Sequence, residues 1–158
     1  MAKNPAERLQ TIIAREKAAK EARVAEEARR VAQQTERQDA EARAGSDWVI
    51  VKPQLEKVVA ELNEQLKETG IALELKASRV PATANRLEDV DVTLSRDGRA
   101  VNSQRLGLKI DRDGLIRATI MVNPHPETEQ APFYVQDPQC IEKFREAVLT
   151  FLEAATSM

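Results

Sequence analysis

Two Asp-Gly pairs divide runs of alternating apolar and polar residues between Leu87 and Val122, and this pattern restricts the possible folds most. Apolar residues at every second position are typical of strands that bury one face. An Asp-Gly pair between two such runs is a strong signal for a β-hairpin. The segment therefore predicts antiparallel strands that turn at Asp97-Gly98 and Asp113-Gly114 and need cover on one face. The predicted inward positions are Val90, Val92, Leu94, Leu106, Leu108, Ile110, Ile116, Ala118, Ile120 and Val122.

Two shorter segments extend this sheet. Ile71–Ser78 alternates in the same way, which predicts a half-buried strand. Phe133–Val135 fits a short edge strand. The residues in between, Val80–Arg86, are expected to form a loop. The outward positions carry both acidic and basic residues, so that face of the sheet is expected to be exposed to solvent.

Helices on either side of the strands can supply the cover. Apolar residues recur at spacings of three and four from Trp48 to Leu66, which is typical of one buried helix face. This helix begins either at Pro53 or earlier, at Ser46, with a kink at the proline. Gly70 is expected to end it in a left-handed conformation. Asp137-Pro138 predicts the start of a C-terminal helix.

The first 45 residues predict a separate, charged helix. Asn4 can cap its free amides, and no Gly or Pro follows between Ala6 and Ala44. Ala, Glu, Arg, Lys and Gln dominate, and all of them favour helix. The helix would be about 60 Å long at 1.5 Å per residue, and Gly45 is expected to end it or to act as a hinge.

The predicted fold class is therefore α+β. A long N-terminal charged helix precedes a two-layer head. The head is an antiparallel meander of four to five strands, packed on one face by a preceding helix and a C-terminal helix. The predicted domains are a helical stalk, residues 1–45, and the head, residues 46–158.

The stalk predicts at most a weak coiled coil. In the best heptad register, six of ten core positions are apolar and all six are alanine, which buries little area. The larger apolar residues of the stalk do not share one stripe in this interpretation. Five alanines are the candidate positions for close helix contact: Ala14, Ala18, Ala25, Ala28 and Ala32.

Charge argues against the chain being primarily a nucleic-acid-binding protein. Residues 1–45 hold 10 basic and 8 acidic residues, and the remainder holds 14 basic and 18 acidic residues. Neither part is the strongly basic footprint that phosphate backbones require. Binding through the N-terminal helix stays open as an alternative, although interleaved glutamates would repel phosphates. The basic positions concerned are Arg8, Arg15, Lys17, Lys20, Arg23, Arg29 and Arg30.

Cysteine content and hydropathy bear on location. Cys140 is the single cysteine, so an intramolecular disulfide or a thiolate cluster cannot form. No apolar run approaches the ~20 residues that span a bilayer, and no signal peptide is recognisable near Met1. We therefore expect a soluble cytoplasmic protein that needs no membrane.

Three sites in the strands and their loops have the residue types for chemistry, and for each a plain structural interpretation is favoured. His125 lies between two prolines, where an exposed loop is more typical than a general base. Asp111-x-Asp113-Gly114 resembles the start of a calcium loop, but Val122 occupies the position of the bidentate Glu. Asp89 and Asp91 share one strand face and could hold a cation, although a solvated face gives the same pattern.

Cys140 and Trp48 complete the candidates. Cys140 falls in the first turn of the last helix, where a thiol pKa can drop, but it also borders the apolar stripe. Trp48 could anchor a partner, yet its helical spacing with Leu55 and Leu62 favours the core. We expect both side chains to be packed. No catalytic residue, cofactor or metal is predicted.

The function predicted from these patterns is a non-enzymatic interaction or scaffold protein. Its helical stalk presents the head, and its partner is another protein or a second copy, so a homo-oligomer is expected. The weaker alternatives are the nucleic-acid accessory protein described above and a head with a ligand pocket or active site. Such a site would use His125 or Asp89 and Asp91.

Overall fold

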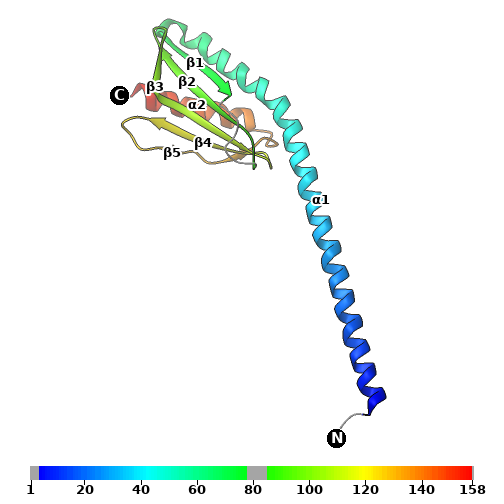
Figure 1. Cartoon of the computed structure of the whole chain (residues 1–158). Coiled ribbons are helices and arrows are strands. Elements are labelled where there is room, and N and C mark those ends of the chain that lie inside the picture. Colours follow the sequence, from blue (N-terminus) through cyan, green and yellow to red (C-terminus); the bar gives the residue numbers. More distant parts are fainter. Residues whose placement is uncertain (1–3, 78–84, 158) are drawn as a thin grey trace. The chain divides into compact units, whose positions relative to one another are not determined.

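The computed structural model describes residues 4–77 and 85–157. These form a long helix, an antiparallel sheet and a C-terminal helix, which confirms the predicted α+β class (Figure 1). The chain divides into two compact units, Met1–Ala40 and Glu41–Met158. Each unit is described by itself below.

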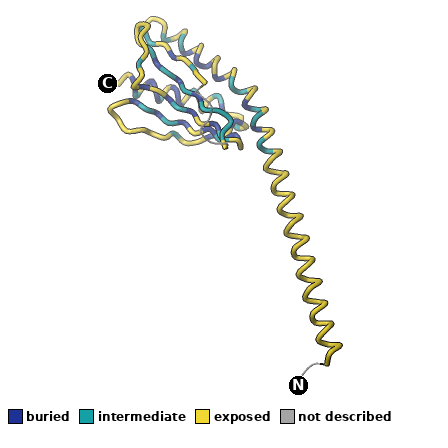
Figure 2. Tube along the Cα trace, in the orientation of Figure 1, coloured by how far each residue is buried: buried dark blue, intermediate teal, exposed yellow. Residues whose placement is uncertain are grey.

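Helix α1 (Pro5–Leu66) begins as the sequence predicts. The Asn4 side-chain oxygen Oδ1 accepts a hydrogen bond from the backbone N–H of Glu7 at 2.8 Å. This satisfies one of the amides that a helix start leaves free. Within the first unit, α1 is exposed on every side from Pro5 to Asp39, as the continuous yellow tube in Figure 2 shows.

The prediction that Gly45 ends the first helix, or that a second helix begins at Pro53, is wrong. Both residues lie inside α1. Gly45 costs about 1 kcal/mol in a helix, but its neighbours Ala44 and Trp48 are buried and hold the segment in place. Pro53 cannot donate to the carbonyl of Val49, and Val49 is 72% exposed, so water can solvate that carbonyl.

The helix was expected to run to Thr69, and its last three residues leave the α-helix. A short 3₁₀ helix, η1 (Lys67–Thr69), follows α1. Gly70 then adopts a left-handed conformation with φ 78°, which confirms it as the stop.

In the part of the chain that the structure describes, the sheet has six strands, two of them only two residues long. Their order is β1-β2-β3-β4, and β5 and β6 both pair with β4. The short β5 was not predicted, whereas β6 matches the expected edge strand. The strands are β1 (Ile71–Ala77), β2 (Arg86–Arg96), β3 (Arg99–Asp111), β4 (Leu115–Val122), β5 (Thr128–Glu129) and β6 (Phe133–Tyr134).

Both predicted Asp-Gly turns are confirmed. Asp97 and Gly98 have φ of 51° and 79°, and Arg96 pairs with Arg99 across the turn. Gly114 has φ 92° between β3 and β4. Of the predicted loop Val80–Arg86, residues 80–84 lie outside the described residues, and Arg86 is already the first residue of β2.

The core lies on one face of the sheet. All ten predicted inward positions of β2, β3 and β4 are buried. The second part of α1 covers them with Leu55, Val58 and Leu62, and the C-terminal helix covers them with Phe144 and Phe151. The two helices share this face, which leaves the other face of the sheet without a covering element among the described residues.

Helix α2 (Cys140–Thr156) starts two residues later than predicted, because Cys140 and not Pro138 is its first helical residue. Asp137 instead forms a turn that leads into the helix. Its Oδ1 accepts from the backbone N–H of Gln139 at 2.8 Å, and its carbonyl accepts from the N–H of Cys140 at 2.9 Å. These bonds stabilise a tight turn and delay the first helical residue.

Candidate functional site

The exposed surface of α1 within the first unit is the first candidate site. Leu9, Ile13, Val24 and Val31 are each more than half exposed. Large apolar side chains standing singly on a surface are common, but several along one side of a helix are typical of a docking surface.

These four residues share one side of the helix, although the five larger apolar residues of the stalk, Ile12 included, do not. An α-helix turns about 100° per residue, so Leu9, Ile13, Val24 and Val31 fall within about 60° of one another. Ile12 lies outside this sector. A heptad repeat has a period of 3.5 residues per turn. Over several turns this period places the same four residues at different angles around the helix, so the heptad register does not group them.

The predicted contact alanines are on this helix and are exposed. Ala14, Ala18, Ala25, Ala28 and Ala32 all lie in the first unit of α1. Ala28 adjoins both valines, because it follows Val24 by four residues and precedes Val31 by three, and Ala32 in turn follows Ala28 by four. Whether another helix contacts these alanines stays a prediction.

Ion pairs occupy some of the basic positions of this helix. Arg29 binds Glu26 at 2.7 Å, and Arg30 binds Glu27 at 2.8 Å. Any phosphate would compete with these carboxylates and would meet their negative charge.

A shallow depression of about 320 Å³ on the uncovered face of the sheet is the second candidate site. Gly107 forms its floor, because β3 carries no side chain at this point. A Cβ atom there would lie 3.2 Å from the Met121 methyl carbon and 3.5 Å from Asp91 Oδ1. The lining residues are Asp89, Asp91, Arg105, Gly107, Leu108, Lys109, Thr119, Met121 and Glu127.

The charges around the depression are mixed and partly paired. Asp89 binds Arg86 at 2.9 Å, and Lys109 lies beside Asp89 in the strand register. Arg105 and Lys109 bring positive charge to the same surface as Asp89 and Asp91. This weakens the case for a cation at the two carboxylates, because the nearby cations would repel it.

The remaining sequence candidates are dispersed. His125 is exposed in the turn after β4 and is not among the residues that line the depression beside Asp89 and Asp91. The Asp111–Asp113 segment forms the predicted turn, in which Gly114 N–H donates to the Asp111 carbonyl at 2.9 Å. Asp111 also binds Arg117 at 3.0 Å. These contacts explain the calcium-like spacing without an ion.

Trp48 and Cys140 are packed, as expected. Trp48 is 5% exposed, and its Nε1 donates to Glu88 Oε2 at 2.6 Å. Lys52 binds the other oxygen of the same carboxylate at 2.6 Å. Burial raises the pKa of the Cys140 thiol to about 11, and the nearby Asp137 carboxylate adds to the effect. A thiol with this pKa is a poor nucleophile at neutral pH.

Gln104 is the one buried polar side chain found among the described residues. It lies on the core face of β3, opposite Val122, and its Oε1 atom has no hydrogen-bond partner in the described structure. Because it faces the core, it cannot contribute to the depression on the other side of the sheet.

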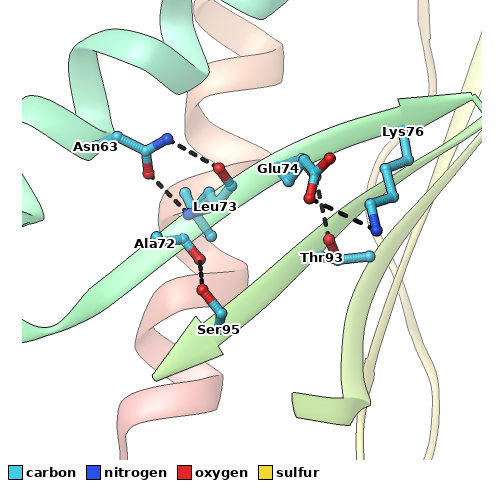
Figure 3. Close-up of polar contacts among 7 residues, drawn as sticks. All are labelled: Asn63, Ala72, Leu73, Glu74, Lys76, Thr93 and Ser95. Carbon is cyan, nitrogen blue, oxygen red and sulfur yellow. Dashed lines mark hydrogen bonds and ion pairs between the residues drawn. The ribbon is translucent and has the colours of Figure 1, made fainter. Parts of the chain in front are cut away.

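Asn63 is a residue whose role the sequence analysis missed. Its side chain accepts from the N–H of Leu73 at 2.7 Å and donates to the Leu73 carbonyl at 2.8 Å (Figure 3). Leu73 is in the edge strand β1, so Asn63 occupies backbone groups that another strand could use. An Asn within a helix, which disfavours helix, was the available signal.

Within residues 4–77 and 85–157, no three His, Cys, Asp or Glu side chains are grouped so that they could hold a metal ion. In the same residues, every helix is too short or too polar to cross a bilayer.

Comparison with known proteins gives no relative: no family model, no curated protein and no solved structure matches this chain.

Proposed function

We propose that this chain is a non-enzymatic interaction protein that self-associates through the first part of α1 and uses this stalk to present its α+β head. The observation that carries the proposal is the exposure of Leu9, Ile13, Val24 and Val31 along one side of a helix. Apolar side chains that stay in water add little stability to an isolated helix, whereas a partner that packs on this side would bury them.

The charge pattern supports a protein partner over a nucleic acid. Arg29 and Arg30 already have glutamate partners on the same helix. Accessory binding to nucleic acid stays the weaker alternative. Loss of all retention on DNA and RNA at low salt would remove it, since binding to phosphates is strongest there.

An active site or ligand pocket in the head is the weakest of the three proposals. The residues that line the depression at Gly107 carry mixed charges, and the exposed His125 is not among them. Unchanged thermal stability across a panel of metals and metabolites would count against it, because a bound ligand stabilises the folded state. As part of the leading proposal we place the protein in a reducing compartment, the cytoplasm, where its single cysteine needs no pairing.

The molar mass of the full chain in solution, measured by light scattering after gel filtration, tests self-association. We expect a dimer or larger species for the native chain. The double variant Val24→Glu/Val31→Glu should be monomeric, because it places charges on the apolar side.

The matched control is Ala22→Glu, which adds a charge to the same helix on the opposite side. It should leave the mass unchanged. A native chain that is monomeric at every concentration would overturn self-association and leave only a different protein as partner.

A further inference from the structure

We propose that the depression at Gly107 binds a small zwitterion, a molecule that carries an ammonium and a carboxylate group on the same carbon atom, as a free α-amino acid does. The inference concerns the head. It goes beyond self-association of the stalk and does not require it. It follows from the glycine itself and from the charges that surround it.

The backbone of β3 does not require a glycine at position 107. Gly107 pairs with Asp91 and Thr119 in regular register, away from the two register shifts between β2 and β3. Three other described glycines have positive φ, and Gly107 does not. A glycine inside a strand weakens the strand, and it typically marks a bulge, a tight bend, or close approach of a ligand or another backbone.

Close approach of another backbone or side chain does not account for Gly107 either. The nearest backbone atom of another strand, the Thr119 carbonyl oxygen, would lie an ordinary 3.9 Å from a Cβ atom at this position. The Met121 methyl carbon would lie at 3.2 Å, but a methionine side chain has several rotatable bonds and can shift by the few tenths of an ångström needed. Close approach of a ligand is the explanation that is left.

The charged groups beside Gly107 are not paired with one another. Arg105 and Lys109 lie two residues before and after it on the same face of β3, and Asp91 lies beside it on β2. Among the described residues, no ion pair involves any of these three side chains. Arg105 Nε donates to Met121 Sδ at 3.4 Å, which holds the guanidinium beside the depression.

This arrangement can hold both ends of a zwitterion. Asp91 Oδ1 lies 3.5 Å from the position that a Cβ atom of Gly107 would take, so an ammonium group resting on the bare backbone can donate to this carboxylate. The Cα atoms of Arg105 and Gly107 are about 7 Å apart along the strand, which the arginine side chain can span. Its terminal N–H groups can donate to the carboxylate of the same ligand, and such charged hydrogen bonds are the strong ones.

Mixed charge is what selects this class of ligand. A bare cation would be repelled by Arg105 and Lys109, and a bare anion would be repelled by Asp91. A zwitterion meets the opposite charge at each end. The volume of about 320 Å³ is at the small end of ligand pockets, which suits a molecule of the size of an amino acid.

An NMR titration of the isotope-labelled full chain with three matched probes tests the proposal. L-Leucine carries both charges, isoamylamine is leucine without its carboxylate, and isocaproate is leucine without its ammonium group. Leucine should shift the amide resonance of Gly107 and should bind at least about tenfold more tightly than either single-charge probe, because each of those loses one charged hydrogen bond.

Two variants and a control locate the site. Asp91→Asn keeps the shape of the side chain and should weaken leucine binding about tenfold, because it removes the charge that holds the ammonium group. Gly107→Ala should also weaken binding, while the free energy of unfolding stays equal or rises, because alanine costs a strand less than glycine. Glu74→Gln removes a carboxylate from the same face outside the depression and should leave binding unchanged.

The contrary outcomes are equally definite. An unshifted Gly107 amide, equal affinity for the three probes, or native affinity in Asp91→Asn would each overturn the proposal. A less stable Gly107→Ala that still binds leucine would show that the glycine serves the packing of Met121. The Val24→Glu/Val31→Glu variant should bind leucine as the native chain does, so the molar-mass test of the stalk and this test fail independently.

Discussion

The first part of α1 and helix α2 are both regular helices, yet they are stabilised differently. The first part has no buried residue from Pro5 to Asp39, and its support is helix propensity, one cap and pairs such as Arg29–Glu26. Helix α2 buries Phe144, Val148 and Phe151 against the sheet. The difference teaches that α2 depends on packing against the sheet, whereas the first part of α1 depends on the helix propensity and ion pairs of its own sequence.

The largest effect should come from the packed helix. Phe144→Ala should lower the free energy of unfolding by about 3–5 kcal/mol, because Phe144 is fully buried and its loss leaves a cavity. Urea unfolding followed by circular dichroism measures the change. Leu149→Ala on the exposed side of α2 and Val24→Ala in the stalk should each cost far less. Equal losses of unfolding free energy in Phe144→Ala and Val24→Ala would contradict the distinction between the two helices.

The next largest effect should be at the edge of the sheet. Asn63→Leu should lower the free energy of unfolding by about 1–3 kcal/mol, because both backbone groups of Leu73 lose their partner. Hydrogen exchange of the Leu73 amide should become faster. Asn63→Asp keeps the acceptor for that amide and should show the smaller loss of protection. Unchanged exchange in Asn63→Leu would contradict the proposed role of Asn63 at this edge.

A smaller effect, of opposite sign, should come from the glycine inside α1. Gly45→Ala should raise the free energy of unfolding by up to about 1 kcal/mol, because alanine favours helix and its Cβ meets Leu87 at an ordinary 3.9 Å. Ala18→Gly is the reverse change in the stalk. It should reduce helical circular dichroism without moving the unfolding midpoint of the head. A lower midpoint for Gly45→Ala would mean that the helix needs flexibility there.

The smallest effect should come from Asp137 and should be lost in acid. The Lys143 ammonium, followed by the N–H of Gln139, lowers the pKa of Asp137 below its usual 3.8. A lowered folded-state pKa adds stability above the unfolded value and loses it as the pH falls through the folded value. The native chain should therefore exceed Asp137→Asn in stability at pH 5, and the gap should close below pH 3.8. Unfolding curves at several pH values measure this gap, and a constant gap would contradict the assignment.

Much of the head was predictable because its signals are local. The alternation in β2, β3 and β4 and the turns at Asp97-Gly98 and Asp113-Gly114 each involve neighbouring residues. The candidate site was predictable only in part. The sequence patterns identified the stalk alanines and the pair Asp89 and Asp91 as candidates. They did not identify the side of the helix that Leu9, Ile13, Val24 and Val31 share, which follows from a turn of about 100° per residue along one continuous helix.

The sequence by itself determined the hairpins, the burial pattern of the sheet and the helical stalk, because period and propensity act within a few residues. The tertiary structure decided the rest. Gly45 and Pro53 stay helical because buried neighbours outweigh their local cost. Asn63 reaches Leu73, and Gly107 opens a depression between Asp91 and Met121, because folding brings separate segments together. Such contacts join residues 10 or more positions apart, and no local pattern records them.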